Sequence, residues 1–532
     1  MHPSNTTPVN TTKTTSPQHW HKPTLRGSRI ASTLMTALLL TLALLPSTAA
    51  AEMESALLNH IANADIRGTK VSVCVMDVGQ RLLLAEIHDD REMIPASNMK
   101  LITTAAALHT LGKDFTFTTK LKMLSNKDAP AGDGLPALVV QGDGDPAFGS
   151  PNVLEDAGYS VDQMLGWWID AVEKTGLDQF NQIIVDDRIF DRGPDQRVHP
   201  SWPKNQLHKW YCAQVMGINF FDNCFLISAN PTRTGQDARV TVYPYGPFVQ
   251  TEMRLKTGRS DQWDIITRPD SNRLAFRGSI RNRQQQYVAM HDPALVFGEV
   301  LKHELSKRNI TVGEVVRPAD DQRLPEGKVL HKLNTTLQAV LNRVNQDSQN
   351  LYAEAILKRS GHAITGAPGT FENGAAAVRE YLAKTIKDPT MAASIKLADG
   401  SGLSRENRVS ARAMVEVLRV QATSKDFRPF LASMAKPGEE GSLRKRFVDE
   451  DDKLIADLYA KTGTINHVSA LSGYLVYPDA GPNNTARVLA FSILANGHGL
   501  GQARNISAVT IRKLQNELIQ IMDEETVGQL VP

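Results

Sequence analysis

Cysteine is scarce in this sequence, with only three such residues among 532. Three cysteines cannot build a scaffold of several disulfides, and a zinc site made of cysteine ligands is excluded for the same reason. Cys74 alternates with apolar residues in a strand-like run, so we expect a buried, unpaired thiol there. Cys212 and Cys224 could either pair with each other or stay free.

Acidic residues are absent from the first fifty positions, which carry the basic residues Lys13, Lys22, Arg26 and Arg29. An apolar run at 34–45 follows, and small residues occupy 49–51. A basic start, an apolar stretch too short to span a bilayer and a small-residue site are typical of a cleaved signal peptide. Residues 1–51 are therefore predicted to be a signal peptide, and an uncleaved membrane anchor is the alternative. These residues contain no Arg-Arg pair, and no cysteine follows the small-residue site. The sequence therefore indicates neither a twin-arginine signal nor a lipid anchor.

Long hydrophobic runs and an excess of one charge are also missing after residue 51. No segment there reaches the length of a transmembrane helix, so the mature chain is expected to be soluble or at most peripheral. The whole chain has a formal net charge of +2, and loss of the four basic residues of the leader leaves about −2. This balance indicates neither nucleic-acid binding nor a polybasic membrane surface. The remaining length of about 480 residues predicts two or three domains.

What is present is a serine at the start of an apolar helix. Residues 95–101 read Pro-Ala-Ser-Asn-Met-Lys-Leu, and the Ala-rich run after them predicts a helix that stops at Gly112. Ser97 and Lys100 are three residues apart, so that the hydroxyl and the amine share one helical face. A serine becomes a nucleophile when a base takes its proton, and a partly desolvated lysine can be that base. Because the same spacing recurs elsewhere, an ordinary helix cap is the alternative; it recurs at Ser201, Ser433 and Ser442.

The rest of the chain divides into a β-rich middle and a more helical end. Strands are predicted at 71–78 and 82–88, joined by the hairpin signal Gly79-Gln80. From about 114 to 330 the sequence has many short strand-like pieces and one helix at 162–174, and a region of this kind without chemistry of its own indicates an insertion. Later helices are predicted at 336–346, 351–358, 371–385 and 411–420, with a glycine-rich loop at 361–369. Strands at 469–477 and 486–495 precede a helix at 503–522, whose apolar positions are expected to pack on a sheet; these are Ile506, Val509, Leu514 and Leu518.

Two further motifs are candidates for a shared site. Lys461-Thr462-Gly463-Thr464 precedes a strand-like run, where a cation, a hydroxyl and a close backbone approach at glycine suit a substrate carboxylate. Ser348-Gln349-Asn350 lies between two helical segments, so its hydroxyl and its amide can face one cleft. Both patterns are common. Lys-Thr-Gly recurs at Lys174 and Lys256, and helix capping is the alternative role for Ser348 and Asn350.

Taken in order, the three motifs resemble the signature of penicillin-binding proteins and serine β-lactamases. Ser348 follows Ser97 by 251 residues, and this separation resembles the class C low-molecular-mass penicillin-binding proteins, the D-alanyl-D-alanine carboxypeptidase/endopeptidase family, which insert two extra domains there. Gln349 departs from the family, which more often has Asp at that position, and its side chain is expected to point away from the cleft. Further stretches that resemble the family are 142–146, 185–190, 219–223, 348–354, 399–405 and 441–444.

The resemblance implies an α/β (α+β) fold of the β-lactamase/transpeptidase type, an antiparallel sheet flanked by helices. Residues 52–114 and 333–532 would form this catalytic domain, and 115–332 two inserted β-rich domains, one nested in the other. The implied activity is that of a periplasmic, serine-type D-Ala-D-Ala carboxypeptidase, and also of a DD-endopeptidase, which acts on peptidoglycan stem peptides and is acylated by penicillins. A serine β-lactamase and a non-catalytic wall-binding or β-lactam-sensing protein are the alternatives. The resemblance implies no metal or organic cofactor and leaves the oligomeric state open.

The same resemblance assigns catalytic roles to Ser97, Lys100, Ser348, Asn350 and Lys461. Ser97 would be the nucleophile and Lys100 its base, while Ser348 would bridge the two lysines and pass a proton to the leaving amine. Asn350 would hold the substrate amide, and the backbone N–H groups of Ser97 and Thr464 would form the oxyanion hole. Substrate-binding roles fall to Thr462, Gly463 and Thr464 near the terminal carboxylate, and to Leu403, Arg405 and Asp186 near the peptide side chain.

Overall fold

The computed structural model describes residues 50–529 except 130–133, 269, 450–452, 482–484 and 499–505. The predicted signal peptide lies outside the described residues apart from its last two positions, which belong to a helix over residues 50–63. In the part of the chain that is described, no helix combines the length and the apolar character needed to cross a membrane.

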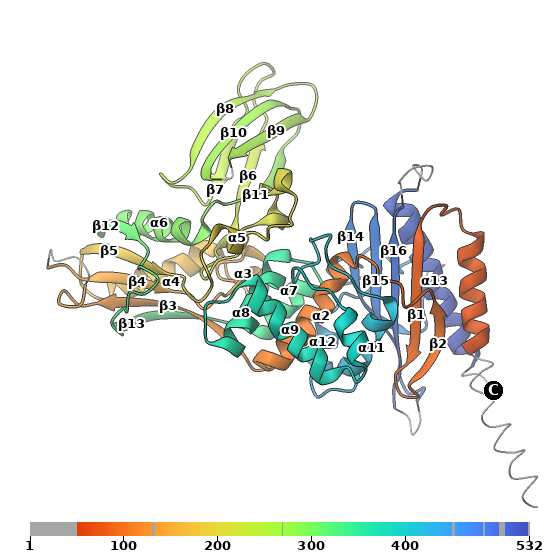
Figure 1. The fold of residues 1–532 in the computed structure, drawn as a ribbon. Coiled ribbons are helices and arrows are strands. Elements are labelled where there is room, and N and C mark those ends of the chain that lie inside the picture. Colours follow the sequence, from red (N-terminus) through yellow and green to blue (C-terminus); the bar gives the residue numbers. More distant parts are fainter. Residues whose placement is uncertain are drawn as a thin grey trace, which may run out of the picture. The chain divides into compact units, whose positions relative to one another are not determined.

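Strands from both ends of the described chain form one five-stranded sheet. It consists of β1 (Lys70–Asp77), β2 (Leu82–Ile87), β14 (Asp457–Ile465), β15 (Val468–Tyr477) and β16 (Arg487–Asn496). Their order is β14-β15-β16-β1-β2, and every neighbouring pair is antiparallel. Figure 1 shows the orange N-terminal strands beside the blue C-terminal strands. The prediction that the early hairpin and the closing strands share a sheet is confirmed.

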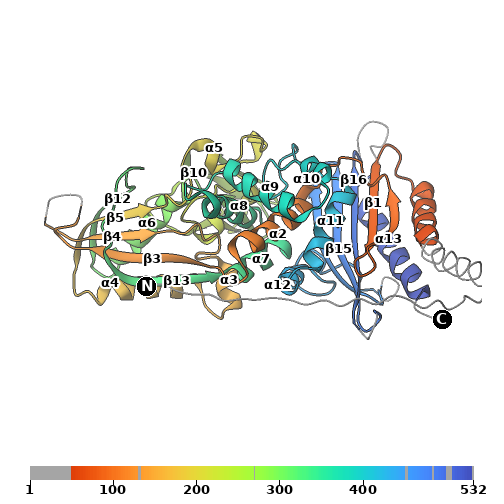
Figure 2. The same ribbon diagram turned by 60° about the horizontal axis from the view of Figure 1, so that its bottom comes forward.

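Helices cover both faces of this sheet (Figure 2). On one face, α13 (Ala508–Gly528) and the helix over 50–63 pack Leu514, Leu518 and Met53 against the strands. The other face carries a helical layer. It contains α2 (Met99–Leu111), α7 (Leu337–Asn345), α8 (Asn350–Thr365), α9 (Phe371–Thr385), α10 (Pro389–Ser394), α11 (Ala411–Ala422) and α12 (Phe427–Ala432). Because it is covered on both sides, β15 is buried along almost its whole length. The implied fold class is therefore confirmed.

Two predictions about helices are wrong. Val509 is 63% exposed, so this position of α13 does not pack on the sheet. Helix α8 runs to Thr365 and includes Gly361, which was expected in a loop. A Cβ at Gly361 would lie 2.1 Å from the Asn373 side chain, so this glycine lets α8 and α9 pack closely instead of ending the helix.

The segment between β2 and β14 contains a second five-stranded sheet. Its order is β12-β5-β4-β3-β13, from β3 (Thr116–Leu124), β4 (Ala137–Gln141), β5 (Gln179–Asp186), β12 (Thr311–Val316) and β13 (Lys328–Thr336). Helices α4 (Val161–Glu173) and α6 (Pro293–Ser306) pack on it through Trp168 and Phe297. Helix α6 was not expected, because the sequence pattern indicated one helix in this region. The short helices α3 (Pro151–Asp156) and α5 (Pro194–Arg197) complete this part.

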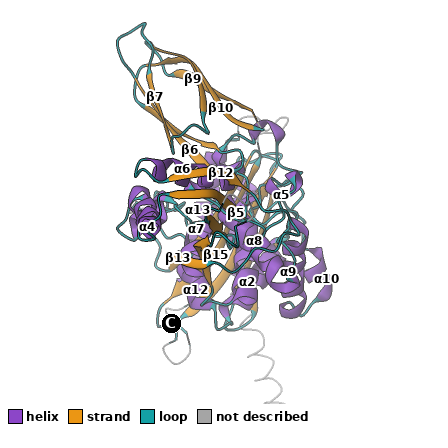
Figure 3. Cartoon of the chain, turned by 90° about the vertical axis from the view of Figure 1, so that its left-hand side faces the viewer, coloured by secondary structure: helices purple, strands orange, loops and turns teal. Residues whose placement is uncertain are grey.

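Two three-stranded sheets are nested within that segment. One has the order β11-β6-β7 and the other β8-β10-β9. The strands are β6 (Cys224–Asn230), β7 (Arg239–Tyr243), β8 (Gln250–Thr257), β9 (Gln262–Arg268), β10 (Ser271–Ile280) and β11 (Gln284–Ala289). Figure 3 shows this part as strands and loops. Cys224 begins β6, and like Cys74 and Cys212 it is a buried free thiol, so Cys212 and Cys224 do not pair.

Candidate active site

Ser97 lies in the short 3₁₀ turn η1 (Ala96–Asn98), directly before α2. Neither η1 nor α2 has a side-chain cap at its N-terminus, so Ser97 does not cap the helix. Its Oγ instead accepts a hydrogen bond of 3.1 Å from Nζ of Lys100. The predicted helical pairing of hydroxyl and amine is therefore present in the structure.

Asn98 anchors the Ser97 turn to the main sheet. Its Nδ2 donates to the backbone carbonyl of Lys461 on β14 at 2.8 Å, and its Oδ1 accepts from the Ser472 hydroxyl on β15 at 2.6 Å. The Asn98 side chain is fully buried, and both of its bonds reach strands more than 350 residues further along the chain. Sequence reasoning missed this residue, because nothing local distinguishes it from a surface asparagine.

Two glycines let distant backbone segments approach the same turn. An ideal Cβ at Gly402 would lie 1.8 Å from the carbonyl oxygen of Ala96, and Gly402 also has a φ of +83°. A Cβ at Gly463 would lie 2.9 Å from the carbonyl oxygen of Pro95 and 3.0 Å from the backbone nitrogen of Ser97. The close approach expected at Gly463 therefore exists, and in this structure the neighbour is the Ser97 turn.

The Lys100 side chain is fully buried and makes three hydrogen bonds. Its Nζ donates to Ser97 Oγ, to Asn350 Oδ1 at 2.7 Å and to the backbone carbonyl of Ser401 at 2.7 Å. Burial lowers the pKa of Lys100 to about 7, although the negative charges of Glu354 and Asp399 oppose this shift. A large share of this amine is therefore neutral at pH 7 and able to take a proton from Ser97.

Ser348 and Asn350 lie at the start of α8. Gln349 is the N-cap of α8 and makes no side-chain cap, so the alternative role of Ser348 and Asn350 in capping is not seen. Asn350 accepts from Lys100 and donates through Nδ2 to the backbone carbonyl of Tyr211 at 2.8 Å. Ser348 has a left-handed backbone with a φ of +63°, which is uncommon outside glycine and concentrates at functional sites. Among the described residues, Ser348 lines the Ser97 cleft but is not hydrogen-bonded to either lysine.

Lys461 and Thr464 lie on β14 beside the Ser97 turn. The Lys461 side chain is fully buried, and its Nζ donates to the backbone carbonyl of Thr462 at 2.8 Å. Burial lowers the pKa of Lys461 well below its ordinary value, and repulsion from Lys100 lowers it further. Thr464 is exposed and lines the cleft. Two amines of reduced basicity therefore lie on the elements that form the site, one hydrogen-bonded to Ser97 and one on the strand beside its turn.

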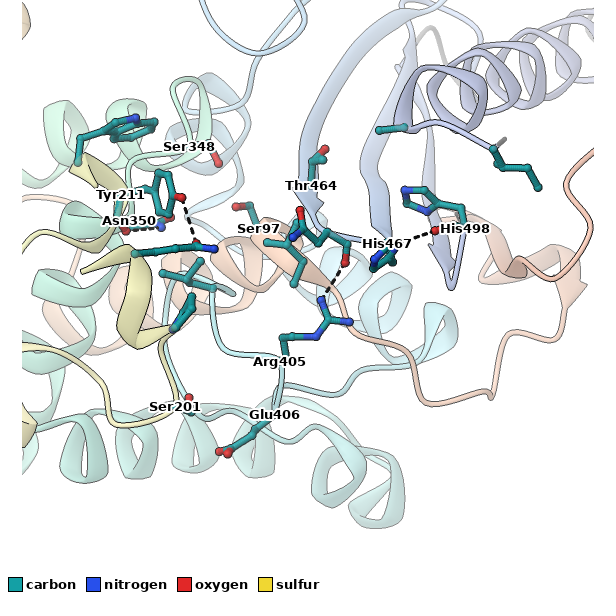
Figure 4. Close-up of a pocket in the computed structure, with 18 residues that line it drawn as sticks. Ser97, Ser201, Tyr211, Ser348, Asn350, Arg405, Glu406, Thr464, His467 and His498 are labelled. Atoms are coloured by element: carbon teal, nitrogen blue, oxygen red, sulfur yellow. Dashed lines mark hydrogen bonds between the residues drawn. The ribbon is translucent and has the colours of Figure 1, made fainter. Parts of the chain in front are cut away.

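These residues surround a cleft of about 950 Å³, shown in Figure 4. Of the predicted site residues, those that line it are Ser97, Ser348, Asn350, Leu403, Arg405 and Thr464. Lys100 does not line the cleft itself but is hydrogen-bonded to Ser97, which does. The strand β14, which carries Thr464, also contains Lys461, Thr462 and Gly463, and these three do not line the cleft. Gln349 is not among the lining residues, in line with the expectation that it points away.

The inserted segment also contributes to the cleft, through residues other than the predicted Asp186. Its lining residues are Ser201, Pro203, Gln206, Trp210 and Tyr211. Trp210 is 43% exposed, and the Tyr211 hydroxyl donates to Gln206 Oε1 at 3.0 Å. An adjacent Trp-Tyr pair in a loop was the available sequence signal, but only the tertiary structure shows that it faces Ser97.

Asp186 does not lie where its predicted role requires. It ends β5 and is not among the described residues that line the cleft. Its carboxylate accepts hydrogen bonds of 2.7 and 3.1 Å from Arg188 and is thereby neutralised within the insertion. Arg405 does line the cleft, where its Nη1 donates to the backbone carbonyl of Asn466 at 2.8 Å.

A pair of buried acids, also missed, shapes the loop that contacts Lys100. Glu354 on α8 accepts from the backbone nitrogens of Gly400 and Ser401, both at 2.8 Å. Asp399 accepts from the backbone nitrogens of Gly402 and Ser404 and from the Trp202 indole. Burial and the neighbouring Asp399 raise the pKa of Glu354 to about 8. These bonds fix the Ser401 carbonyl that receives the Lys100 amine.

A serine hydroxyl beside a buried amine with a pKa near neutrality is equipped for nucleophilic acyl transfer. Here that pair lies at the junction between an antiparallel sheet and a helical layer. The combination of this chemistry with this fold defines a serine enzyme of the β-lactamase/transpeptidase class.

The chain belongs to the D-Ala-D-Ala carboxypeptidase 3 (S13) family, whose profile matches residues 53–517. It is 29% identical over 504 residues to the D-alanyl-D-alanine carboxypeptidase of Actinomadura sp. (strain R39), covering 89% of this chain and 88% of the relative. It is 25% identical over 471 residues to D-alanyl-D-alanine carboxypeptidase DacB of Haemophilus influenzae, covering 85% and 91%. Penicillin binding protein 4 (dacB) of Haemophilus influenzae has the same fold, with a TM-score of 0.71 at 21% identity over 88% of this chain and 99% of that one. The expected family and the expected serine-type D-Ala-D-Ala carboxypeptidase activity are confirmed.

Proposed function

We propose that the chain hydrolyses the terminal D-Ala-D-Ala bond of peptidoglycan stem peptides through an acyl-enzyme on Ser97. The observation that carries this proposal is the 3.1 Å hydrogen bond between Lys100 and Ser97, made by an amine whose pKa is about 7. In the first step Lys100 takes the Ser97 proton, and Oγ attacks the carbonyl carbon between the two D-alanines. The carbon–nitrogen bond then breaks, and D-alanine leaves as its amine receives the proton. Water hydrolyses the ester in the second step and restores the Ser97 hydroxyl.

The oxyanion of each tetrahedral intermediate would be held by the backbone N–H groups of Ser97 and Thr464. Loss of one such donor costs about 2.7–4 kcal/mol in a comparable hydrolase. Gly463 supports this assignment, because the absence of a Cβ lets β14 approach the Ser97 nitrogen; a Cβ there would lie 3.0 Å from it. The Asn98 side chain also joins the Ser97 turn to β14, by its hydrogen bond to the Lys461 carbonyl. The two oxyanion donors therefore lie on backbone segments that are held together.

Proton transfer to the leaving amine is assigned to Ser348, whose left-handed backbone holds it in the wall of the cleft. Asn350 positions Lys100 through Oδ1, which keeps a second lone pair for an amide N–H of the substrate. Lys461, Thr462 and Thr464 would bind the terminal carboxylate. A bound carboxylate would raise the depressed pKa of Lys461, so binding of substrate and protonation of this amine reinforce each other.

The subsite for the peptide side chain is assigned to Leu403 and Arg405, which both line the cleft. A guanidinium suits a side-chain carboxylate, because it forms two parallel hydrogen bonds with it. The position of Asp186 gives no support to its part in this subsite, since Arg188 already occupies its carboxylate.

We further propose that residues 1–51 direct export to the periplasm and that penicillins acylate Ser97. The structure of penicillin binding protein 4 (dacB) from Haemophilus influenzae complexed with a β-lactam supports the second part, with a TM-score of 0.67 and 21% identity. The division into a catalytic domain and two inserted domains over 115–332 is part of the same proposal. It is supported by the separate sheets, although β13 continues four residues past that boundary, to Thr336.

Labelling with a fluorescent penicillin tests the nucleophile. The wild-type chain is expected to form a persistent covalent adduct that Ser97→Ala abolishes, together with D-alanine release from a pentapeptide. Ser442→Ala is the matched control, because this exposed serine has the same Ser-x-x-Lys spacing and lies outside the cleft. Label that survives in S97A, or its absence from the wild type, contradicts the proposal. Rapid loss of the adduct would instead favour the β-lactamase alternative.

A further inference from the structure

The nested sheet β8-β10-β9 lies in the most basic part of the chain. Residues 231–290, which contain it, include ten basic and five acidic side chains, a net charge of +5, whereas the whole chain carries +2. Acidic residues therefore outnumber basic ones in the remainder of the chain. Figure 1 shows the three strands of this sheet side by side. A concentration of one charge in one segment indicates a binding surface for a partner of the opposite charge.

Strand alternation separates the two faces of this sheet. Leu255, Ile265 and Phe276 are buried in the core of the inserted segment, so the residues next to them in each strand point to solvent. On the solvent side the three strands form a pocket of about 350 Å³, here called the arginine pocket. It does not share a lining residue with the Ser97 cleft. Its lining includes Arg254, Arg268, Arg273 and Arg277, around the apolar side chains of Ile266 and Ala275.

Two of the four arginines are neighbours across the strands. Arg277 on β10 is the register partner of Arg254 on β8, and like charges on neighbouring strands destabilise a sheet. Arg254 forms an exposed ion pair of 2.5 Å with Glu252. Arg277 forms one of 3.1 Å with Asp264. Exposed ion pairs are weak, so both guanidinium groups stay available to an incoming anion.

The other two arginines are unpaired within the described part of the chain. Arg268 and Arg273 are exposed, and neither side chain makes an ion pair or a hydrogen bond there. A guanidinium binds a carboxylate through two parallel hydrogen bonds. Ile266, which is 41% exposed, offers apolar contact between the arginines. The arginine pocket therefore fits a ligand that combines more than one carboxylate with apolar atoms.

A peptidoglycan strand has this chemistry. Each uncleaved stem peptide ends in the carboxylate of D-alanine, and many stem peptides project from one glycan strand, so that carboxylates and methyl groups recur along the polymer. A lipid surface fits less well. Apolar side chains that bind a membrane protrude into it, whereas Ile266 and Ala275 line a recess among the arginines.

We propose that the arginine pocket is a second binding site, outside the catalytic cleft, for the stem-peptide carboxylates of a peptidoglycan strand. This inference rests on the proposed function, which makes such strands the substrate. A strand held by one stem peptide keeps its other stem peptides near the same molecule, so their effective concentration at Ser97 rises. The site should therefore lower KM for the polymer and leave the chemistry at Ser97 unchanged.

Sedimentation with insoluble peptidoglycan that carries pentapeptide stems tests the binding. Every chain in this assay carries Ser97→Ala, so that the polymer is not cleaved. Arg268→Gln combined with Arg273→Gln is expected to weaken binding about tenfold, the effect of two exposed ion pairs. Arg281→Gln combined with Arg283→Gln is the matched control, because these exposed arginines belong to the same segment but lie outside the pocket. Amidation of the wall carboxylates should weaken binding of the parent S97A chain to the level of R268Q/R273Q.

Turnover gives a second readout, in chains that keep Ser97. In R268Q/R273Q, KM for D-alanine release from the polymer is expected to rise while kcat stays the same. The value of kcat/KM for a soluble pentapeptide and the rate of penicillin labelling should equal those of the wild type, because neither substrate reaches two sites at once.

An equal loss of wall binding in the two double variants, or no loss in either, overturns the inference, and so does binding that survives amidation. Arginine-dependent binding to vesicles of anionic phospholipid without binding to peptidoglycan also overturns it, in favour of a membrane. A chain that labels at Ser97 and releases D-alanine but shows no arginine-dependent wall binding loses the second site and keeps the proposed function. Failure of labelling overturns the proposed function itself.

Discussion

Replacing Gly402 by alanine should disable the nucleophile without touching a reacting group. The added Cβ would lie 1.8 Å from the carbonyl oxygen of Ala96, whereas ordinary contacts begin at 3.4 Å. The two backbones must therefore separate by about 1.6 Å. A side-chain rotation cannot relieve this clash, because the atoms that the Cβ would meet are backbone atoms of Ala96 and Ser97.

Either outcome of that separation damages the site. If the Ser97 turn moves, Oγ leaves its position beside Lys100 and the oxyanion donors are displaced. If the loop at Gly402 moves, the Ser401 carbonyl no longer holds the Lys100 amine. A misplacement of about 1 Å can cost about a hundredfold in rate, so acylation by penicillin should slow by at least about that factor.

The control is Gly366→Ala, at the C-cap of α8. Gly366 has a φ of +70°, similar to the +83° of Gly402, but its Cβ would meet nothing within 4 Å. It should therefore show only the backbone strain of a left-handed alanine, about 1–2 kcal/mol. The rate of penicillin labelling and the thermal unfolding are measured for both variants. Backbone strain affects both of them, whereas the steric clash with Ala96 affects only G402A. If G402A is acylated within about threefold of the wild-type rate, the close approach does not position Ser97.

Two further predictions concern the same assembly. The acylation rate should rise with pH through about 7, because only the neutral Lys100 amine takes the Ser97 proton and burial lowers its pKa to about 7; a rate that is flat from about pH 5 to 9 contradicts its role as base. Asn98→Ala should lower the free energy of unfolding by about 2–4 kcal/mol in denaturant titrations, because the buried Lys461 carbonyl and Ser472 hydroxyl each lose a partner, whereas the exposed Asn59→Ala should change it little.

The elements of the main sheet and the nucleophile helix could be predicted because their signals are local. The run after Ser97 is rich in alanine and other apolar residues, and α2 ends before Gly112 as expected. Strand β1 with buried Cys74 likewise follows from alternation and a turn signal. The sequence predicts too short an α8, because Gly361 locally indicates a helix break, whereas in the fold it lies in the contact with α9.

The three motifs identified most of the cleft because order and spacing carried the argument. What could not be predicted is contributed by tertiary contacts. Tyr211 faces Asn350 from the insertion, and Glu354 holds the loop at Ser401, yet neither contact leaves a local signature. The role of Asp186 in the side-chain subsite stays a prediction, because the sequence shows the carboxylate but not its hydrogen bond with Arg188.

The pairing of β1 with β16 sets the order in which activity can emerge. Val73 pairs with Ile493, so β1 finds this neighbour only about 420 residues later in the chain. The pairing of β3 with β13 joins Thr116 to Thr336, so that the segment between them is closed on itself and the loop that remains between β1 and β16 is effectively shorter. A partly emerged chain that already carries Ser97 is therefore expected to stay inert until β14, β15 and β16 have followed, so that this hydrolase is assembled only when most of its chain is present.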